Sequence, residues 1–212
     1  MMNDKDCEEY NNIGRKIPLK ERFQYVSGKQ ITDGDTGKRV YEISNYRLPS
    51  VTTILGATKN TDFLKKWKAK VGEVEAERIK IHSSSRGTAM HKFLESYVEG
   101  VGYDDLTGIG QEARPMANKI IEKGLSNVTR KRGSKKEEWI EDYYLQIAAY
   151  AMAHDYVYKS NIRQGLIMVC TPDLFYQEFR ITDHELRAWK HKFLKRLDMY
   201  HDLMFDEKEK AK

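Results

Sequence analysis

The chain has 212 residues, of which 40% are hydrophobic and 33% are charged, and its formal net charge is +5. The length and hydrophobic content predict one hydrophobic core, and the charged content predicts a soluble protein. No apolar run approaches the roughly 20 residues that cross a bilayer, and the polar, acidic N-terminus predicts no secretory leader. Cys7 and Cys170 suggest neither a disulfide framework nor a zinc site, so we expect a cytoplasmic protein with no membrane partner.

The first predicted elements follow residues 1–20, which we expect to be disordered. From Phe23 to Ile43, aromatic and β-branched residues alternate with polar ones around Asp33 and Gly34, which predicts a hairpin or small meander. Ser50 is the expected cap of a short helix. The helices predicted in this half of the chain cover residues 51–58, 61–70, 73–81 and 88–98.

The second half begins with a glycine-rich loop over residues 100–110. Helices are expected over 111–124 and 137–158, and the second should pack on the helices of 73–98. Two strands, 164–171 and 174–181, then form an antiparallel pair, and Thr182 or Asp183 caps a last helix that frays into the polar tail, 206–212. We therefore expect an α+β fold, mostly helical with a small antiparallel β element, in one domain over residues 21–205.

Positive charge is concentrated in one interval. Between Lys119 and Lys136 there are seven basic residues and one acid, so this interval carries +6 and the rest of the chain −1. A milder concentration over residues 59–70 places Lys66 beside Trp67. Cations beside aromatic rings suit single-stranded DNA, because they neutralise phosphates while the rings stack on bases. The alternative is solvated surface, with Trp67 in the core. The predicted DNA-binding cations of the interval are Arg130, Lys131, Arg132, Lys135 and Lys136.

Three segments, "LPSVTTIL", "SRGTAMHKFLESYV" and "WIEDYYLQIAAYAMAH", resemble in their order the RecB-like branch of the PD-(D/E)XK nucleases. They are most similar to phage exonucleases akin to the mitochondrial genome maintenance exonuclease. Gly87, Thr88 and His91 match a GTxxH motif, and Gln146 and Tyr150 match a QxxxY motif. The resemblance implies a restriction-endonuclease-like fold, a Mg²⁺- or Mn²⁺-dependent hydrolase acting on DNA in phage replication and repair, and His91 as a metal ligand.

The family's carboxylates do not have counterparts at the expected place. Such enzymes hold metal with an Asp and an acid-x-Lys on neighbouring strands, and these should lie between His91 and Trp139. No Asp occurs between Asp105 and Asp142, and the one acid-x-Lys begins at Asp206, in the tail. We therefore expect that both catalytic strands are missing, with a join near residues 129–135, and that the central sheet is incomplete. If the metal site is incomplete as well, no metal binds.

One segment imitates the missing motif. Asp173, Glu178 and Arg180 resemble a PD and an acid-x-cation pair. The acid lies only five residues from the Asp, across a tight turn, and Arg stays charged and cannot transfer a proton as Lys does. The pattern therefore predicts a hairpin without a catalytic role.

Three functions remain open from the sequence, so whether the chain is an enzyme is not decided. The first is a metal-dependent DNA exonuclease in which Glu95, Asp104 or Asp105 acts with His91. The second is a family member that has lost catalysis and binds single-stranded DNA, with Gln146 and Tyr150 among its contacts. The third is a truncated product without a function.

Overall fold

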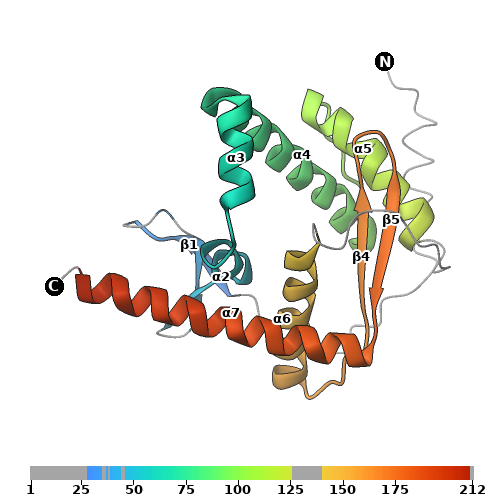
Figure 1. The fold of residues 1–212 in the computed structure, drawn as a ribbon. Coiled ribbons are helices and arrows are strands. Elements are labelled where there is room, and N and C mark those ends of the chain that lie inside the picture. The colour runs from blue at the N-terminus through green and yellow to red at the C-terminus, as the bar shows by residue number, and fades with distance from the viewer. Residues whose placement is uncertain (1–27, 35–36, 38, 44–45, 126–139, 211–212) are drawn as a thin grey trace. The chain divides into compact units, whose positions relative to one another are not determined.

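The computed structural model describes residues 28–34, 37, 39–43, 46–125 and 140–210, with side chains described as far as residue 206 (Figure 1). The prediction of an α+β fold that is mostly helical, with a small antiparallel β component, is confirmed. No helix in these ranges is both long and apolar enough to cross a membrane. The predicted disorder of residues 1–20 lies outside the described part of the chain.

The chain divides into two compact units. The described parts of unit 1 are residues 62–125 and 168–179, and those of unit 2 fall within 28–61, 140–167 and 180–210. The expected packing of the helix at 73–98 on the helix at 137–158 concerns one helix from each unit and stays a prediction.

Unit 2 begins with a three-stranded antiparallel meander of β1 (Lys29–Thr32), β2 (Arg39–Ile43) and β3 (Tyr46–Pro49). In register, Ile31 lies opposite Val40. The predicted hairpin or meander is confirmed for β1 and β2, whereas β3 was not expected from the sequence. Proline is unusual within a sheet, but β3 is an edge strand and ends at Pro49. The missing N–H of Pro49 therefore costs no hydrogen bond inside the sheet.

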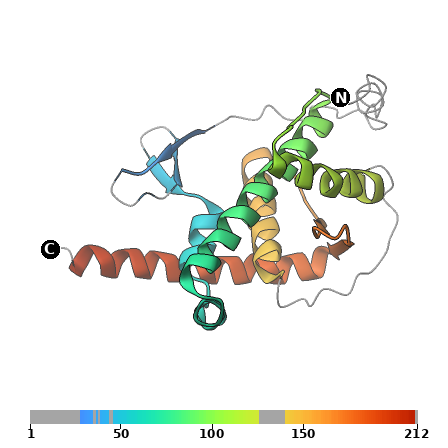
Figure 2. The same cartoon turned by 90° about the horizontal axis from the view of Figure 1, so that it is seen from above.

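The core of unit 2 forms where α2 (Val51–Ala57), α6 (Glu141–Tyr158) and α7 (Asp183–Lys210) meet. Its buried side chains are Ile54, Leu55, Leu145, Ala149, Phe193 and Tyr200. Figures 1 and 2 show α2 and α6 lying against the long helix α7. The amphipathic pattern of each helix thus supplies one side of a shared core.

The predicted helix caps of unit 2 are confirmed. The Ser50 side chain accepts a hydrogen bond of 3.0 Å from the Thr53 amide at the start of α2. At the start of α7, the Leu186 amide donates to the Thr182 carbonyl, and the Thr182 amide donates to Glu185 at 3.0 Å. Thr182 is therefore the cap rather than Asp183. The helix α7 continues to Lys210 instead of fraying at residue 206, because glutamate and lysine are good helix formers.

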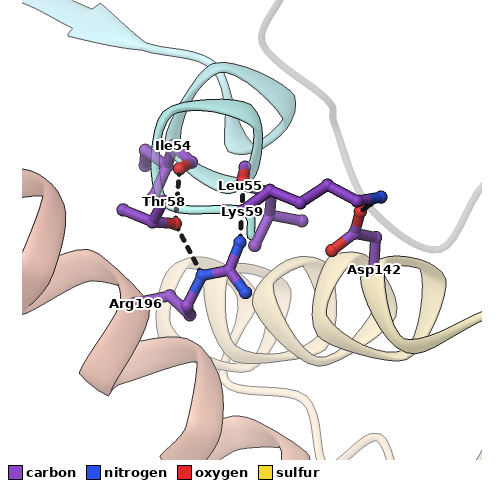
Figure 3. Close-up of polar contacts among 6 residues, drawn as sticks. All are labelled: Ile54, Leu55, Thr58, Lys59, Asp142 and Arg196. Carbon is purple, nitrogen blue, oxygen red and sulfur yellow. Dashed lines mark hydrogen bonds and ion pairs between the residues drawn. The ribbon is translucent and has the colours of Figure 1, made fainter. Parts of the chain in front are cut away.

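Arg196 ties α7 to the end of α2 (Figure 3). Its Nε donates to Thr58 Oγ1 at 2.6 Å, and its Nη2 donates to the Leu55 carbonyl at 2.7 Å. These bonds satisfy a carbonyl that a helix end otherwise leaves without a partner. Beside them, Lys59 forms an ion pair with Asp142 of α6, so polar contacts hold all three helices around the core.

Unit 1 contains α3 (Asp62–Val71), α4 (Glu73–Glu99), α5 (Gly108–Ile120) and the π-helical turn η1 (Ile121–Leu125). The sequence predicted two helices over residues 73–98, but α4 is continuous through its polar "HSSSRG" stretch. The reason is tertiary: one side of α4 packs on α5 through Ala89 and Phe93, and Arg86 within the polar stretch adds a hydrogen bond of 3.0 Å to Glu112. Burial of this apolar side outweighs the modest helix propensity of serine and glycine.

The two helices α4 and α5 approach closely because small residues line their contact. Ala89 and Phe93 of α4 pack with Ala113 and Ala117 of α5. A second cluster places Met116, Ile120 and Cys170 together. The core of unit 1 therefore includes the tip of the next element, a β hairpin.

That hairpin consists of β4 (Gly165–Cys170) and β5 (Tyr176–Ile181). The second strand begins two residues later than predicted, because Leu174 has a φ of 62° and lies in the turn, where its amide donates to the Thr171 carbonyl. At Gly124 a Cβ would lie 2.3 Å from Met168 Sδ, so glycine permits the close approach of the hairpin to η1.

Candidate metal and nucleic-acid site

The GTxxH residues lie on one exposed face of α4. Gly87, Thr88 and His91 line a shallow depression with Glu95, together with Ser84 and Lys92 of the same helix. The His91 side chain is exposed, whereas Phe93 on the other side of α4 is fully buried. His91 is therefore a surface residue and does not have the packing role that a core histidine would have.

Glu95, one turn from His91, is engaged by a neighbouring cation. Lys92 Nζ donates to Glu95 Oε2 at 2.9 Å, and this hydrogen bond raises the pKa of Lys92. Both side chains are about half exposed, so water screens the pair and the interaction is weak. Among the described residues, the carboxylate that lines the His91 face is thus paired with an ammonium group.

Asp104 and Asp105 have structural partners at the start of α5. Asp104 forms an ion pair with Arg114. Asp105 Oδ1 accepts hydrogen bonds from the Thr107 amide at 3.0 Å and from the Thr107 hydroxyl at 2.7 Å. Thr107 in turn caps α5 by accepting from the Gly110 amide at 3.1 Å. This capping starts the helix at Gly108, three residues before the predicted start at 111.

The donor set that the described residues place around His91 does not fit Mg²⁺ or Mn²⁺. These cations prefer several oxygen ligands in an octahedral array, and this face offers one imidazole and one carboxylate that is paired with lysine. Throughout the part of the chain that the structure describes, no three His, Cys, Asp or Glu side chains form a group that could hold a metal ion. The metal implied by the resemblance stays a prediction.

The QxxxY residues lie on the exposed side of α6. Gln146 Nε2 donates to the Tyr150 hydroxyl at 2.8 Å, and Tyr150 is 53% exposed. Tyr143, about two turns before Tyr150 on the same side, is 48% exposed, whereas Leu145 on the other side is in the core. The helix therefore presents two aromatic rings and an amide to solvent, and Tyr143 adds to the residues predicted from the sequence.

The predicted cationic residues fall in two places. Lys66 is exposed on α3 and Trp67 is half-buried there. The other five cations lie outside the described residues: Arg130, Lys131, Arg132, Lys135 and Lys136. Phe63, the second aromatic residue that the sequence places among these lysines, is 72% exposed one turn before Trp67. Because residues four apart lie on one face of a helix, Phe63 and Trp67 share a side of α3.

Asp173 and Glu178, which imitate the acids of the nuclease motif, lie at different places in the hairpin. Asp173 is exposed in the turn, while Glu178 is buried in β5 and accepts a hydrogen bond from the Tyr176 hydroxyl at 3.2 Å. Burial, with the nearby charge of Glu178, raises the pKa of Tyr176 to about 12. Glu178 is thus a hydrogen-bond partner of Tyr176 within the hairpin.

Comparison with known proteins yields no match, whether against protein families, curated proteins or solved structures. The contacts described above and the motifs of the sequence are therefore the basis for a functional proposal.

Proposed function

We propose that this protein descends from the RecB-like branch of the PD-(D/E)XK nucleases and binds single-stranded DNA without hydrolysing it. The order of the GTxxH and QxxxY motifs supports the ancestry, and with it a restriction-endonuclease-like fold whose central sheet is incomplete. The protein is then phage-encoded and acts in the cytoplasm of a bacterial host, in the replication or repair of DNA.

The loss of hydrolysis rests on one observation, the contacts of the three candidate acids. Metal-dependent cleavage of a phosphodiester needs carboxylates that converge on a cation and activate water. Glu95 is paired with Lys92, Asp104 with Arg114, and Asp105 binds the cap of α5. Glu95 lies on α4 and the two Asp residues lie in the loop before α5, and the partners of all three favour a structural role over metal binding.

DNA binding is supported by exposed rings and by charge. Tyr143 and Tyr150 are about half exposed on α6, and Phe63 is exposed among the lysines of α3. Aromatic side chains stack on the bases of a single strand without regard to sequence, and a positive surface attracts its backbone. The interval of charge +6 between Lys119 and Lys136 provides the largest such attraction in the sequence.

A second candidate function is a residual metal-dependent exonuclease. One observation favours it: His91 and Glu95 are both exposed, one turn apart, and line the same depression on α4. A cation would have to displace Lys92 from Glu95 and recruit at least one further acid. Asp104 and Asp105 are the nearest candidates in sequence.

The binding proposal is tested by the salt dependence of affinity. A fluorescently labelled thymidine oligomer should bind more weakly as salt rises, with a log–log slope of about −0.7 for each neutralised phosphate. Replacing Arg130, Lys131 and Arg132 by Ala should flatten this slope. Lys80→Ala is the matched control, because Lys80 is an exposed cation already paired with Glu77 on α4.

Absence of binding by the unchanged protein would refute the proposal. An unchanged slope in the triple variant would show that this interval is solvated surface and that other cations contact DNA.

A further inference from the structure

Helix α3 presents an aromatic ring among lysines that the described residues of its own unit leave exposed. Phe63, Lys66, Trp67 and Lys70 lie three or four residues apart, so they share one side of the helix. None of the ten residues of α3 is buried, and the Phe63 ring is 72% exposed. An exposed ring of this size beside cations is a feature of binding surfaces rather than of cores.

The charges on α3 are mostly available for a ligand. The helix contains four lysines and one acid, and that acid, Asp62, lies 3.8 Å from Lys65. Within the described residues, no carboxylate lies at ion-pair distance from Lys66 or Lys70. The face around Phe63 is therefore cationic and complements a polyanion.

We propose that this face of α3 binds single-stranded DNA, with Phe63 stacked on a base and Lys66 and Lys70 contacting phosphates. At the helical rise, the two lysines lie about 4.5 and 10.5 Å along the axis from Phe63, which lets both reach one strand. Single-stranded rather than duplex DNA fits, because a ring can stack only on a base that is not already paired and stacked. This inference rests on the proposed function and names the residues of one contact.

An anionic membrane is the competing partner for a basic helix with exposed apolar residues. A helix that lies in a membrane interface inserts a continuous apolar face. On α3, Trp67 and Val71 would complete that face, and both are half-buried in the protein. Leu64 is also exposed, at 44%, but it lies about 100° around the helix from Phe63, on the side away from Lys66 and Lys70. Phe63 is thus the exposed apolar side chain beside these two lysines, and one ring suits a base better than a bilayer.

The test compares two labelled oligomers of equal length, one of thymidine nucleotides and one of abasic sugar phosphates. The protein should bind the thymidine oligomer more tightly. Phe63→Ala should weaken that binding roughly tenfold, as expected for loss of one stacked base, and leave the abasic oligomer unaffected. Phe63→Tyr should keep the preference, whereas Phe63→Leu, which is apolar but has no ring, should lose most of it.

Two controls separate this contact from general effects. Val74→Ala removes an apolar side chain that is 87% exposed near the start of α4, and it should leave both affinities unchanged. Lys66→Ala and Lys70→Ala should each reduce the magnitude of the salt slope by about 0.7 and retain the preference for thymidine. Because the side chains of Phe63, Lys66 and Lys70 are exposed, we expect their replacement to leave the fold unchanged.

The outcomes distinguish this inference from the proposed function. If the protein binds DNA but Phe63→Ala binds both oligomers as before, the α3 contact is wrong and the proposed function stands. If the unchanged protein binds neither oligomer, both fail. If Phe63→Ala loses affinity only for vesicles of phosphatidylserine and phosphatidylcholine, the face is a membrane surface and the inference is overturned.

Discussion

At the scale of single residues, Asp155 shows how a carboxylate is used for structure. Its Oδ1 accepts hydrogen bonds of 2.8 Å from both Ser160 Oγ and the Ile162 amide, and its Oδ2 accepts one of 3.0 Å from Lys190 of α7. Burial tends to raise the pKa of Asp155, but these hydrogen bonds outweigh burial and hold the pKa below its ordinary value. The carboxylate thereby fixes the chain after α6 onto α7.

This network predicts a pH-dependent loss of stability in Asp155→Asn. The folded-state pKa is lowered, so the carboxylate stabilises the fold above its unfolded pKa of about 3.9, and this contribution disappears as the pH falls through the folded pKa. At pH 7 the free energy of unfolding should fall by about 1–3 kcal/mol. The difference between the variant and the unchanged protein should shrink below pH 4, as measured by urea unfolding.

Asp183→Asn is the matched control, because Asp183 is 53% exposed and lies 3.5 Å from Arg187. It should change stability little at any pH. An equal loss in both variants, or a loss in Asp155→Asn that is constant down to pH 2, would contradict the assigned role of Asp155.

At the scale of elements, the start of α5 depends on a glycine at one position and not at another. A Cβ at Gly110 would lie 2.3 Å from the Asp105 carbonyl oxygen, whereas a Cβ at Gly108 would meet nothing within 4 Å. The close approach lets Asp105 reach Thr107 and Thr107 cap the helix. The loop and helix are therefore fitted to each other at Gly110.

Gly110→Ala should destabilise the protein by about 1–3 kcal/mol, because the added methyl group forces the loop away from the helix. Gly108→Ala, two residues earlier in the same first turn, should be close to neutral. Urea unfolding of the two variants measures the difference. Equal stabilities would show that the Asp105 loop is not packed on the start of α5.

The elements also show what a sequence pattern can predict and where it fails. Ser50 and Thr182 were identified as caps because a cap depends on residues three positions away at most. The continuity of α4 was missed because it depends on the packing of Ala89 and Phe93 against α5, a contact between residues distant in sequence. The strand β3 was missed because its partner β2, not its own composition, defines it.

The candidate site follows the same division. The helical positions of His91, Gln146 and Tyr150 were predictable from spacing, and the structure places each on an exposed helix face. The contacts of Asp104 and Asp105 were not predictable, because Arg114 and Thr107 become their partners only when the loop folds back on α5. The positions of the acids in the sequence could not show that Asp104 pairs with Arg114 and that Asp105 binds the cap of α5.

At the scale of the whole molecule, two cores hold two compact units. The sequence predicted one domain over residues 21–205, and that prediction remains to be tested by experiment. The GTxxH face belongs to unit 1 and the QxxxY face to unit 2. Thr88 and His91 in unit 1 and Tyr150 in unit 2 are exposed, as a surface for DNA requires, and Glu95 beside His91 is paired with Lys92.

The central claim, binding without hydrolysis, is tested most directly by one incubation. An end-labelled single-stranded oligonucleotide is mixed with the purified protein and Mg²⁺ or Mn²⁺, and each sample is analysed on native and denaturing gels. We predict retarded but full-length DNA, and the same result for His91→Ala. Metal-dependent shortening that co-purifies with the protein and disappears in His91→Ala would contradict the claim. It would show that His91 binds a catalytic metal with carboxylates such as Glu95, Asp104 or Asp105.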